Sequence, residues 1–204
     1  MTMLLQLALS GIAQGSIYAL LALGMTVVFR ATGVINFAHG EFFMLGAFVV
    51  YVLIQYVGAP FVLAAPLAAI VMFLVGRGVE RMLIRPIALS PHIILAMMTV
   101  ALSYLLRGVA RVFWGREVLP MPPVFAFPPI EAGSLIITVQ DILVAAMTLA
   151  LVLAFFLFFR LTRFGRIAQA ASANPRGAAL VGIDVDAFRG NMWGMAAALG
   201  GITG

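Results

Sequence analysis

The sequence predicts an all-α fold: a polytopic transmembrane helical bundle of about six spans in a single domain, residues 1–204, with one helix that can be broken. Three observations lead to this prediction. Of the 204 residues, 64% are hydrophobic and 9% are charged, whereas soluble domains are roughly half apolar and a quarter charged. Several apolar runs approach the ~20 residues that cross a bilayer as a helix. All twelve basic residues are arginine, and most lie where apolar runs end.

Composition also excludes several classes of function. The net charge of +5 comes from arginines at the ends of apolar runs, which indicates orientation in a membrane, and no basic stripe with interleaved aromatics suggests a nucleic-acid partner. Cysteine is absent, so thiolate metal sites and cysteine nucleophiles are excluded. The sequence contains no GxxxxGK[ST], HExxH or GxSxG signature. We therefore expect no catalytic residues, no metal and no cofactor.

The first span, residues 3–29, lacks the positive start of a signal peptide and is expected to remain uncleaved. At helical spacing, Gln6, Ser10 and Gln14 share one face, and Gly11 and Gly15 likewise share a face. Small and polar residues favour helix contacts in membranes, so we expect this surface to face other helices. Lining a transport pathway is the alternative.

The next stretch interrupts an apolar run with Asn36, His39, Gly40 and Glu41. Ionisable groups at membrane depth are costly and usually functional. In a continuous helix His39 and Glu41 would point about 200° apart, so we expect no direct pair between them unless the helix breaks near Gly40. Two interpretations stay open: a broken helix that lines the translocation path or acts as a hinge, and an interfacial turn that caps the next span.

The remaining spans are predicted from apolar runs separated by turn signals. They are residues 42–57, 61–83, 92–113, 142–159 and 188–204. The proline-rich stretch 114–140 is predicted to be an extended surface loop, with a strand pattern only at LIITV. The last fourteen residues would form about 21 Å of helix against a core of roughly 30 Å, so we expect a chain truncated in its sixth helix.

The segment 160–189 contains five arginines and two helix stop and start signals. Asn174 suits an N-cap, Pro175 the first helical position and Gly182 a left-handed C-cap. A helix this short is marginal alone, which suggests that a partner surface holds it. The alternative is an ordinary arginine-rich loop between spans.

Successive spans end on opposite sides of the membrane, and nine arginines fall on one side against three on the other. The more basic side is predicted to be inside. The amino terminus and the loop 114–140 then lie outside, and the segment 160–189 faces the cytoplasm.

Two stretches resemble the permease subunits of bacterial high-affinity branched-chain amino acid importers of the ATP-binding-cassette class. The first is residues 15–47, with the core GVINFAHGEFFMLGA, and the second is FGRIAQAASANPRGAALVGIDVDAFR, residues 164–189. The second is similar to the cytoplasmic loop where such permeases contact their ATPase. The residues expected to couple to the ATPase are Asn174, Pro175, Arg176, Ala178, Ala179, Gly182 and Ile183.

The resemblance implies a multi-pass protein of the bacterial inner membrane, in contact with membrane lipid, that works with several partners. These would be cytoplasmic ATPase subunits, a second permease subunit and an extracytoplasmic protein that delivers leucine, isoleucine or valine. Family members usually continue with further membrane helices, so the resemblance implies a C-terminally truncated permease. The alternatives are a permease of the same family for urea or another small amide or acid, and an ion-coupled secondary transporter with a His39 and Glu41 proton relay.

Overall fold

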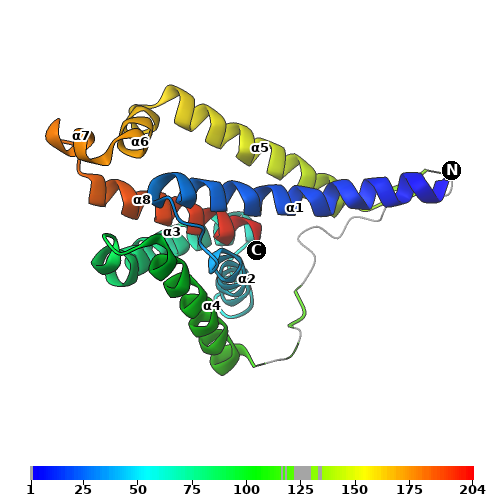
Figure 1. Ribbon diagram of the computed structural model, residues 1–204. Coiled ribbons are helices and arrows are strands. Elements are labelled where there is room, and N and C mark those ends of the chain that lie inside the picture. Colours follow the sequence, from blue (N-terminus) through cyan, green and yellow to red (C-terminus); the bar gives the residue numbers. More distant parts are fainter. Residues whose placement is uncertain (1, 116, 118, 122–129, 133–134) are drawn as a thin grey trace.

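The computed structural model describes residues 2–115, 117, 119–121, 130–132 and 135–204 and confirms the all-α prediction. Figure 1 shows long helices that cross one another, with two short helices, α6 and α7, at one end. The helices are α1 (Thr2–Thr32), α2 (His39–Gln55), α3 (Phe61–Val79), α4 (His92–Trp114), α5 (Val139–Leu161), α6 (Arg163–Ala173), α7 (Pro175–Leu180) and α8 (Val185–Thr203). A π-helical turn η1 (Glu80–Ile84) and a 3₁₀ turn η2 (Arg85–Ile87) extend α3.

Four of the described helical segments are long and apolar enough to cross a membrane. They are Gln6–Thr32, Phe61–Ile87, His92–Trp114 and Val139–Leu161. The shorter α2 is also apolar. Each predicted span falls on a helix, although α2 begins three residues before the predicted position 42 and α8 three before position 188.

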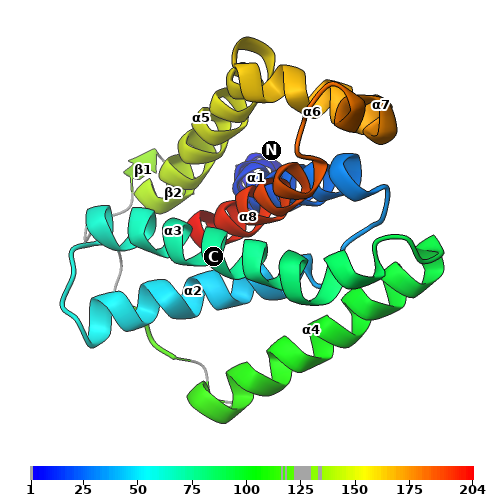
Figure 2. The same cartoon turned by 90° about the vertical axis from the view of Figure 1, so that its left-hand side faces the viewer.

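The core is built around α8, which packs against α1, α2 and α3. Figure 2 shows α8 between α1 on one side and α3 with α2 on the other. Small residues bring the backbones close: a Cβ at Gly46 would overlap the Cα of Gly201, and one at Gly76 would lie 2.6 Å from the Trp193 carbonyl oxygen. Lipid is as apolar as a helix surface, so this close packing, rather than hydrophobicity, holds membrane helices together.

The surface of α1 differs from the prediction. The difference is partial, because Gln6 is half-buried and lines, with Ser10, a cavity between α1 and α5. Gly11, Gln14 and Gly15 are exposed, and a Cβ at either glycine would meet nothing within 4 Å. The buried positions of α1 are instead Ala13, Leu20, Val27 and Val28. A hydroxyl on this helix can make its hydrogen bond within the helix, as the Ser16 Oγ does by donating to the Ile12 carbonyl at a distance of 2.7 Å. Such a hydroxyl needs no partner on another helix.

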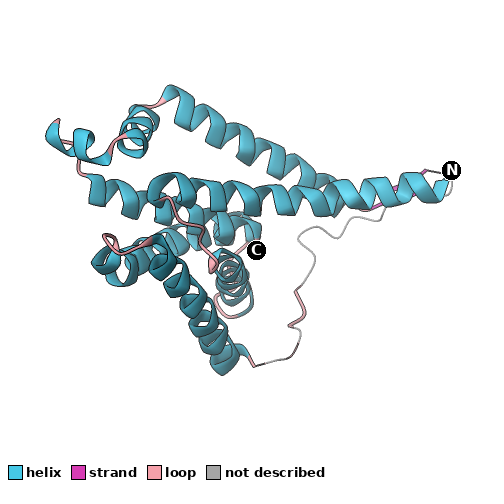
Figure 3. Ribbon diagram, viewed as in Figure 1, coloured by secondary structure: helices cyan, strands magenta, loops and turns pink. Residues whose placement is uncertain are grey.

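The predicted loop 114–140 is only partly described. Strands β1 (Ile130–Ala132) and β2 (Leu135–Ile137) form an antiparallel pair in which Ile130 is opposite Ile137, which confirms the strand pattern at LIITV. Figure 3 shows a structure that is helical almost throughout, with a short strand segment beside α1. The expectation of an extended chain at 122–129 and 133–134 lies outside the described residues. The loop ends at α5, whose N-cap Thr138 accepts a hydrogen bond from the Asp141 N–H.

Candidate functional site

A break between α1 and α2 places polar residues deep beside other helices. Gly33 ends α1 with φ +70°, and a Cβ there would lie 3.5 Å from the His92 ring at the start of α4. Four residues later, the Phe37 N–H donates to the Thr99 hydroxyl over 3.2 Å. His92 and Thr99 are roughly 10 Å apart along α4. Residues 33–37 therefore follow α4 in an extended path, from its first residue to Thr99.

The start of α2 is therefore held inside the bundle. Asn36 and His39 are buried, and the Asn36 Oδ1 accepts from the Ala38 N–H over 3.0 Å in a local turn. A Cβ at Gly24 of α1 would overlap the His39 imidazole, so this glycine makes room for the ring. Gly40 lies within the regular helix α2, so the break precedes His39 rather than occurring at Gly40. The broken helix that lines the translocation path stays a prediction, as does the interfacial turn.

Glu41 is the buried charge of this site. Its Oε1 accepts from the Ser103 Oγ over 2.8 Å and from the Arg107 Nε over 2.7 Å, and the Arg107 Nη2 lies 2.6 Å away. His39 and Glu41 do not pair with each other, as expected for a continuous helix. Sequence reasoning missed the pairing of Arg107 with Glu41. The available signal was the spacing of Ser103 and Arg107, one turn apart on the same helix.

A cavity of about 190 Å³ adjoins this ion pair between α2 and α4. It is lined by Glu41, Met44, Phe48, Arg107, Ala110, Arg111 and Gly115. One wall is charged, with one carboxylate and two guanidinium groups, and the other is apolar. The apolar wall is stiffened because the Phe48 ring stacks on Trp114 with centroids 4.5 Å apart. A carboxylate beside two guanidiniums and an apolar wall can bind a small zwitterion with an apolar side chain.

The second candidate site is α7, and its predicted caps are confirmed. The Asn174 Oδ1 accepts from the Gly177 N–H over 2.9 Å, and Pro175 occupies the first helical position. At the other end Gly182 has φ +86°. The Gly182 N–H donates to the Ala179 carbonyl and the Ile183 N–H donates to the Ala178 carbonyl, each with a donor–acceptor distance of 3.0 Å. This pair of bonds is a Schellman motif, which fixes the end of the helix.

One face of α7 is anchored and the other is open. Ala178 is buried in the main core cluster, and Ile183 packs against that cluster. Leu180 is 89% exposed and Val181 77% exposed, and Arg176 is also exposed. Figure 1 shows α6 and α7 extending from the bundle at the end where α5 finishes and α8 begins. The helix is thus held rigidly while it presents two large apolar side chains.

Membrane-length helices around a buried carboxylate that pairs with an arginine, with a capped helix at one end, are the features of a multi-pass membrane protein. The family described as "Branched-chain amino acid transport system / permease component" matches residues 7–204, and the chain belongs to this family. A permease is one component of a transport system, so the chain works with partner components.

Three curated relatives show the extent of the similarity. The chain is 30% identical to the high-affinity branched-chain amino acid transport system permease protein LivH of Escherichia coli, over 98% of this chain and 69% of the relative. It is 28% identical to BraD of Pseudomonas aeruginosa, over 88% of this chain and 62% of the relative. It is 30% identical to a probable LivH of Methanocaldococcus jannaschii, over 95% and 62%. No solved structure matches the chain.

Proposed function

We propose that the chain is the permease subunit of an ATP-binding-cassette importer and forms a translocation path for branched-chain amino acids. Its partners would be cytoplasmic ATPase subunits, a second permease subunit and an extracytoplasmic substrate-binding protein. Family membership and the names of the relatives support the transport role and the substrate class. The observation that carries the importer mechanism is α7, a helix of six residues capped at both ends with an open apolar face.

We assign α7 to ATPase docking because of how it is held. A single short helix has little stability of its own, yet its caps and the buried Ala178 fix its position. Leu180 and Val181 then offer apolar area to a partner, and Arg176 offers charge at the rim. The residues proposed to couple to the ATPase are Asn174, Pro175, Arg176, Ala178, Ala179, Gly182 and Ile183. Ala178 and Ile183 contribute by anchoring the helix in the core, while Leu180 and Val181 add exposed apolar area to the docking surface.

Gly182→Val is expected to uncouple ATP hydrolysis from uptake, because a β-branched residue is strained at φ +86° and the Schellman motif would open. Gly182→Asn is the matched control, since asparagine tolerates the left-handed region. The measurement is leucine uptake per ATP hydrolysed in proteoliposomes containing the assembled transporter. Normal coupling in well-folded Gly182→Val would count against ATPase docking through α7.

The translocation path is assigned to the break and the adjoining cavity. Asn36 lies just before α2, and His39, Gly40 and Glu41 are the first residues of that helix. All but Gly40 are buried, and buried polar groups at membrane depth persist only beside protein partners or a water-filled cavity. An amino acid needs a partner for each of its two charges. Glu41 suits its ammonium, and Arg107 with Arg111 suits its carboxylate. An importer fed by a binding protein needs only a weak site of this kind.

We also propose an inner-membrane orientation with the amino terminus outside. In support, most arginines lie at one end of the bundle. At this end meet the last turn of α1, the turn after η2 and the start of α8. A cysteine replacing Tyr56 should react with an impermeant maleimide in right-side-out vesicles, because it follows α2 on the outer side. A cysteine replacing the fully exposed Leu89 should react only after the membrane is opened. The reverse pattern would invert the topology.

A further inference from the structure

The end of α3 departs from regular helix at the point where it meets α8. Residues Glu80–Ile84 form a π-helical turn, in which the Arg85 N–H bonds to the Glu80 carbonyl, and a 3₁₀ turn follows. In an α-helix, residues five apart point about 140° away from each other. The wider π turn brings Glu80 and Arg85 to one side, so the irregular backbone makes their pairing possible. Such π turns are frequent at functional sites.

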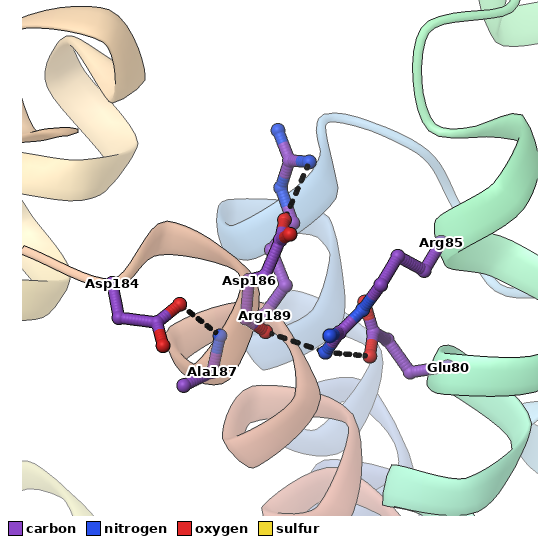
Figure 4. Close-up of polar contacts among 6 residues, drawn as sticks. All are labelled: Glu80, Arg85, Asp184, Asp186, Ala187 and Arg189. Carbon is purple, nitrogen blue, oxygen red and sulfur yellow. Dashed lines mark hydrogen bonds and ion pairs between the residues drawn. The ribbon is translucent and has the colours of Figure 1, made fainter.

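The carboxylate of this pair is buried, and its guanidinium also contacts α8. The Glu80 side chain is 1% exposed, and a buried carboxylate requires a partner. The Arg85 Nη2 lies 2.9 Å from the Glu80 Oε2, and the Arg85 Nε lies 3.4 Å from Oε1. The same Nη2 donates to the Asp186 backbone carbonyl over 3.0 Å. Figure 4 shows the guanidinium between the carboxylate and the first turn of α8.

Close packing supports the same contact. A Cβ at Gly190 of α8 would lie 3.1 Å from the Glu80 Oε2 and 3.5 Å from the Arg85 Nη2, so the absence of a side chain lets α8 approach the pair. The first turn of α8 is itself fixed, because the Asp184 Oδ1 accepts from the Ala187 N–H over 2.8 Å. We name Glu80, Arg85, Gly190 and the Asp186 carbonyl the α3–α8 joint.

The joint lies at the first turn of α8, the helix that follows α7 in the chain. Only residues 181–184 separate α7 from α8, and the Schellman motif and the Asp184 cap leave this connection little freedom. A displacement of α7 therefore reaches the first turn of α8 directly. Without the joint, that turn could move while the end of α3 stayed behind. With it, the ends of both helices move as one body.

We infer that the Glu80 and Arg85 pair couples α7 to the translocation path by holding the start of α8 to the end of α3. This role rests on the proposed docking of α7 on an ATPase. Both residues are positioning residues, since they act through α8 rather than on the amino acid. Arginine is required at position 85, because its planar fork can contact the carboxylate and the Asp186 carbonyl together, whereas lysine offers a single ammonium.

The test compares Arg85→Lys with Arg81→Lys in the transporter reconstituted with its ATPase, its second permease and its binding protein. Arg81 lies in the same π turn but is exposed, which makes it a matched control. Arg85→Lys should assemble with the ATPase and hydrolyse ATP, while leucine uptake per ATP falls at least about fivefold, the lower end of usual coupling between sites. Arg81→Lys should keep the wild-type ratio.

A second measurement reports the joint itself. The chain has no cysteine, so spin labels can be placed at Met82, which is 77% exposed, and at Asp186, whose side chain is 56% exposed and whose contact with Arg85 is made by the backbone carbonyl. The distance between the labels should stay constant between nucleotide-free and ATP-bound complexes of the wild type. In Arg85→Lys it should differ between the two states, because α3 no longer follows α8. A purely structural pair would not produce this difference.

Each outcome is decisive. A wild-type ratio of uptake to ATP hydrolysis in assembled Arg85→Lys would overturn the inference. Where Arg85→Lys does not accumulate, Glu80→Gln repeats the test, and failure of both to accumulate beside a normal Arg81→Lys would show that the pair serves folding alone and would also overturn it. If the wild-type chain does not associate with an ATPase, the docking proposal fails first, and this is seen without any variant.

Discussion

Gly46→Ala is expected to separate α2 from α8 and to lower the melting temperature of the purified chain in detergent. An added Cβ would overlap the Gly201 Cα and lie 2.8 Å from the Gly200 carbonyl oxygen. These are backbone atoms, which cannot rotate away as a side chain can. Overpacking costs about 1–3 kcal/mol, which corresponds to a fall of at least about 3 °C for a chain of this size.

Trp193 provides the readout, because it is buried on α8 and lies edge-on to Phe42 of α2 with ring centroids 6.5 Å apart. Its fluorescence should shift to the red in Gly46→Ala as the two helices separate. Gly40→Ala is the matched control on the same helix, since a Cβ there meets nothing within 4 Å. It should be neutral or stabilising by up to about 1 kcal/mol through helix propensity. Equal destabilisation by both variants would disprove a special role for close packing at Gly46.

Glu41→Gln is expected to reduce leucine uptake strongly. The substitution removes the negative charge that faces Arg107, and it weakens hydrogen bonds that a carboxylate makes better than an amide. Bonds to charged groups contribute about 1.5–3 kcal/mol, so a loss of at least about tenfold is expected. Ser103→Ala removes a hydroxyl donor to the same oxygen without changing the charge, and its effect should be smaller.

The double variant Glu41→Gln with Arg107→Gln separates a structural pair from a site that binds the amino acid. Removal of both charges leaves no unpaired ion, so the amount of folded chain should recover relative to Glu41→Gln. Uptake should stay low, because the groups proposed to meet the ammonium and the carboxylate are both missing. Recovery of wild-type uptake in the double variant would show that the pair only supports the bundle.

The features predictable from sequence are those determined by nearby residues. Asn174, Pro175 and Gly182 identify both ends of α7, because capping depends on neighbours within four positions. The same logic could have placed the start of α8, where Asp184 is a side-chain cap that the prediction overlooked. Apolar run lengths likewise indicated the four described segments that are long enough to cross a membrane. The predicted spans 42–57 and 188–204 fall on α2 and α8, which are not among these four.

Contacts between helices were not predictable in this way. The Glu41 and Arg107 pair joins residues 66 positions apart, and no local pattern specifies which helix faces α2. The exposed surface at Gly11 and Gly15 was misassigned for a related reason. In a membrane, both the lipid and a partner helix are apolar, so hydrophobic patterning alone does not separate a packed face from an exposed one.

The central position of α8 also determines the order in which the protein can be completed. The ribosome makes α1, α2 and α3 first, and the surfaces at Gly46 of α2 and Gly76 of α3 are covered only when α8 has been synthesised. The Arg85 contact with the Asp186 carbonyl illustrates the delay, since it joins residues 101 positions apart. High contact order slows folding and prolongs the lifetime of incomplete states. During translation, α1, α2 and α3 therefore remain in the bilayer as an incompletely packed bundle until α8 has been synthesised.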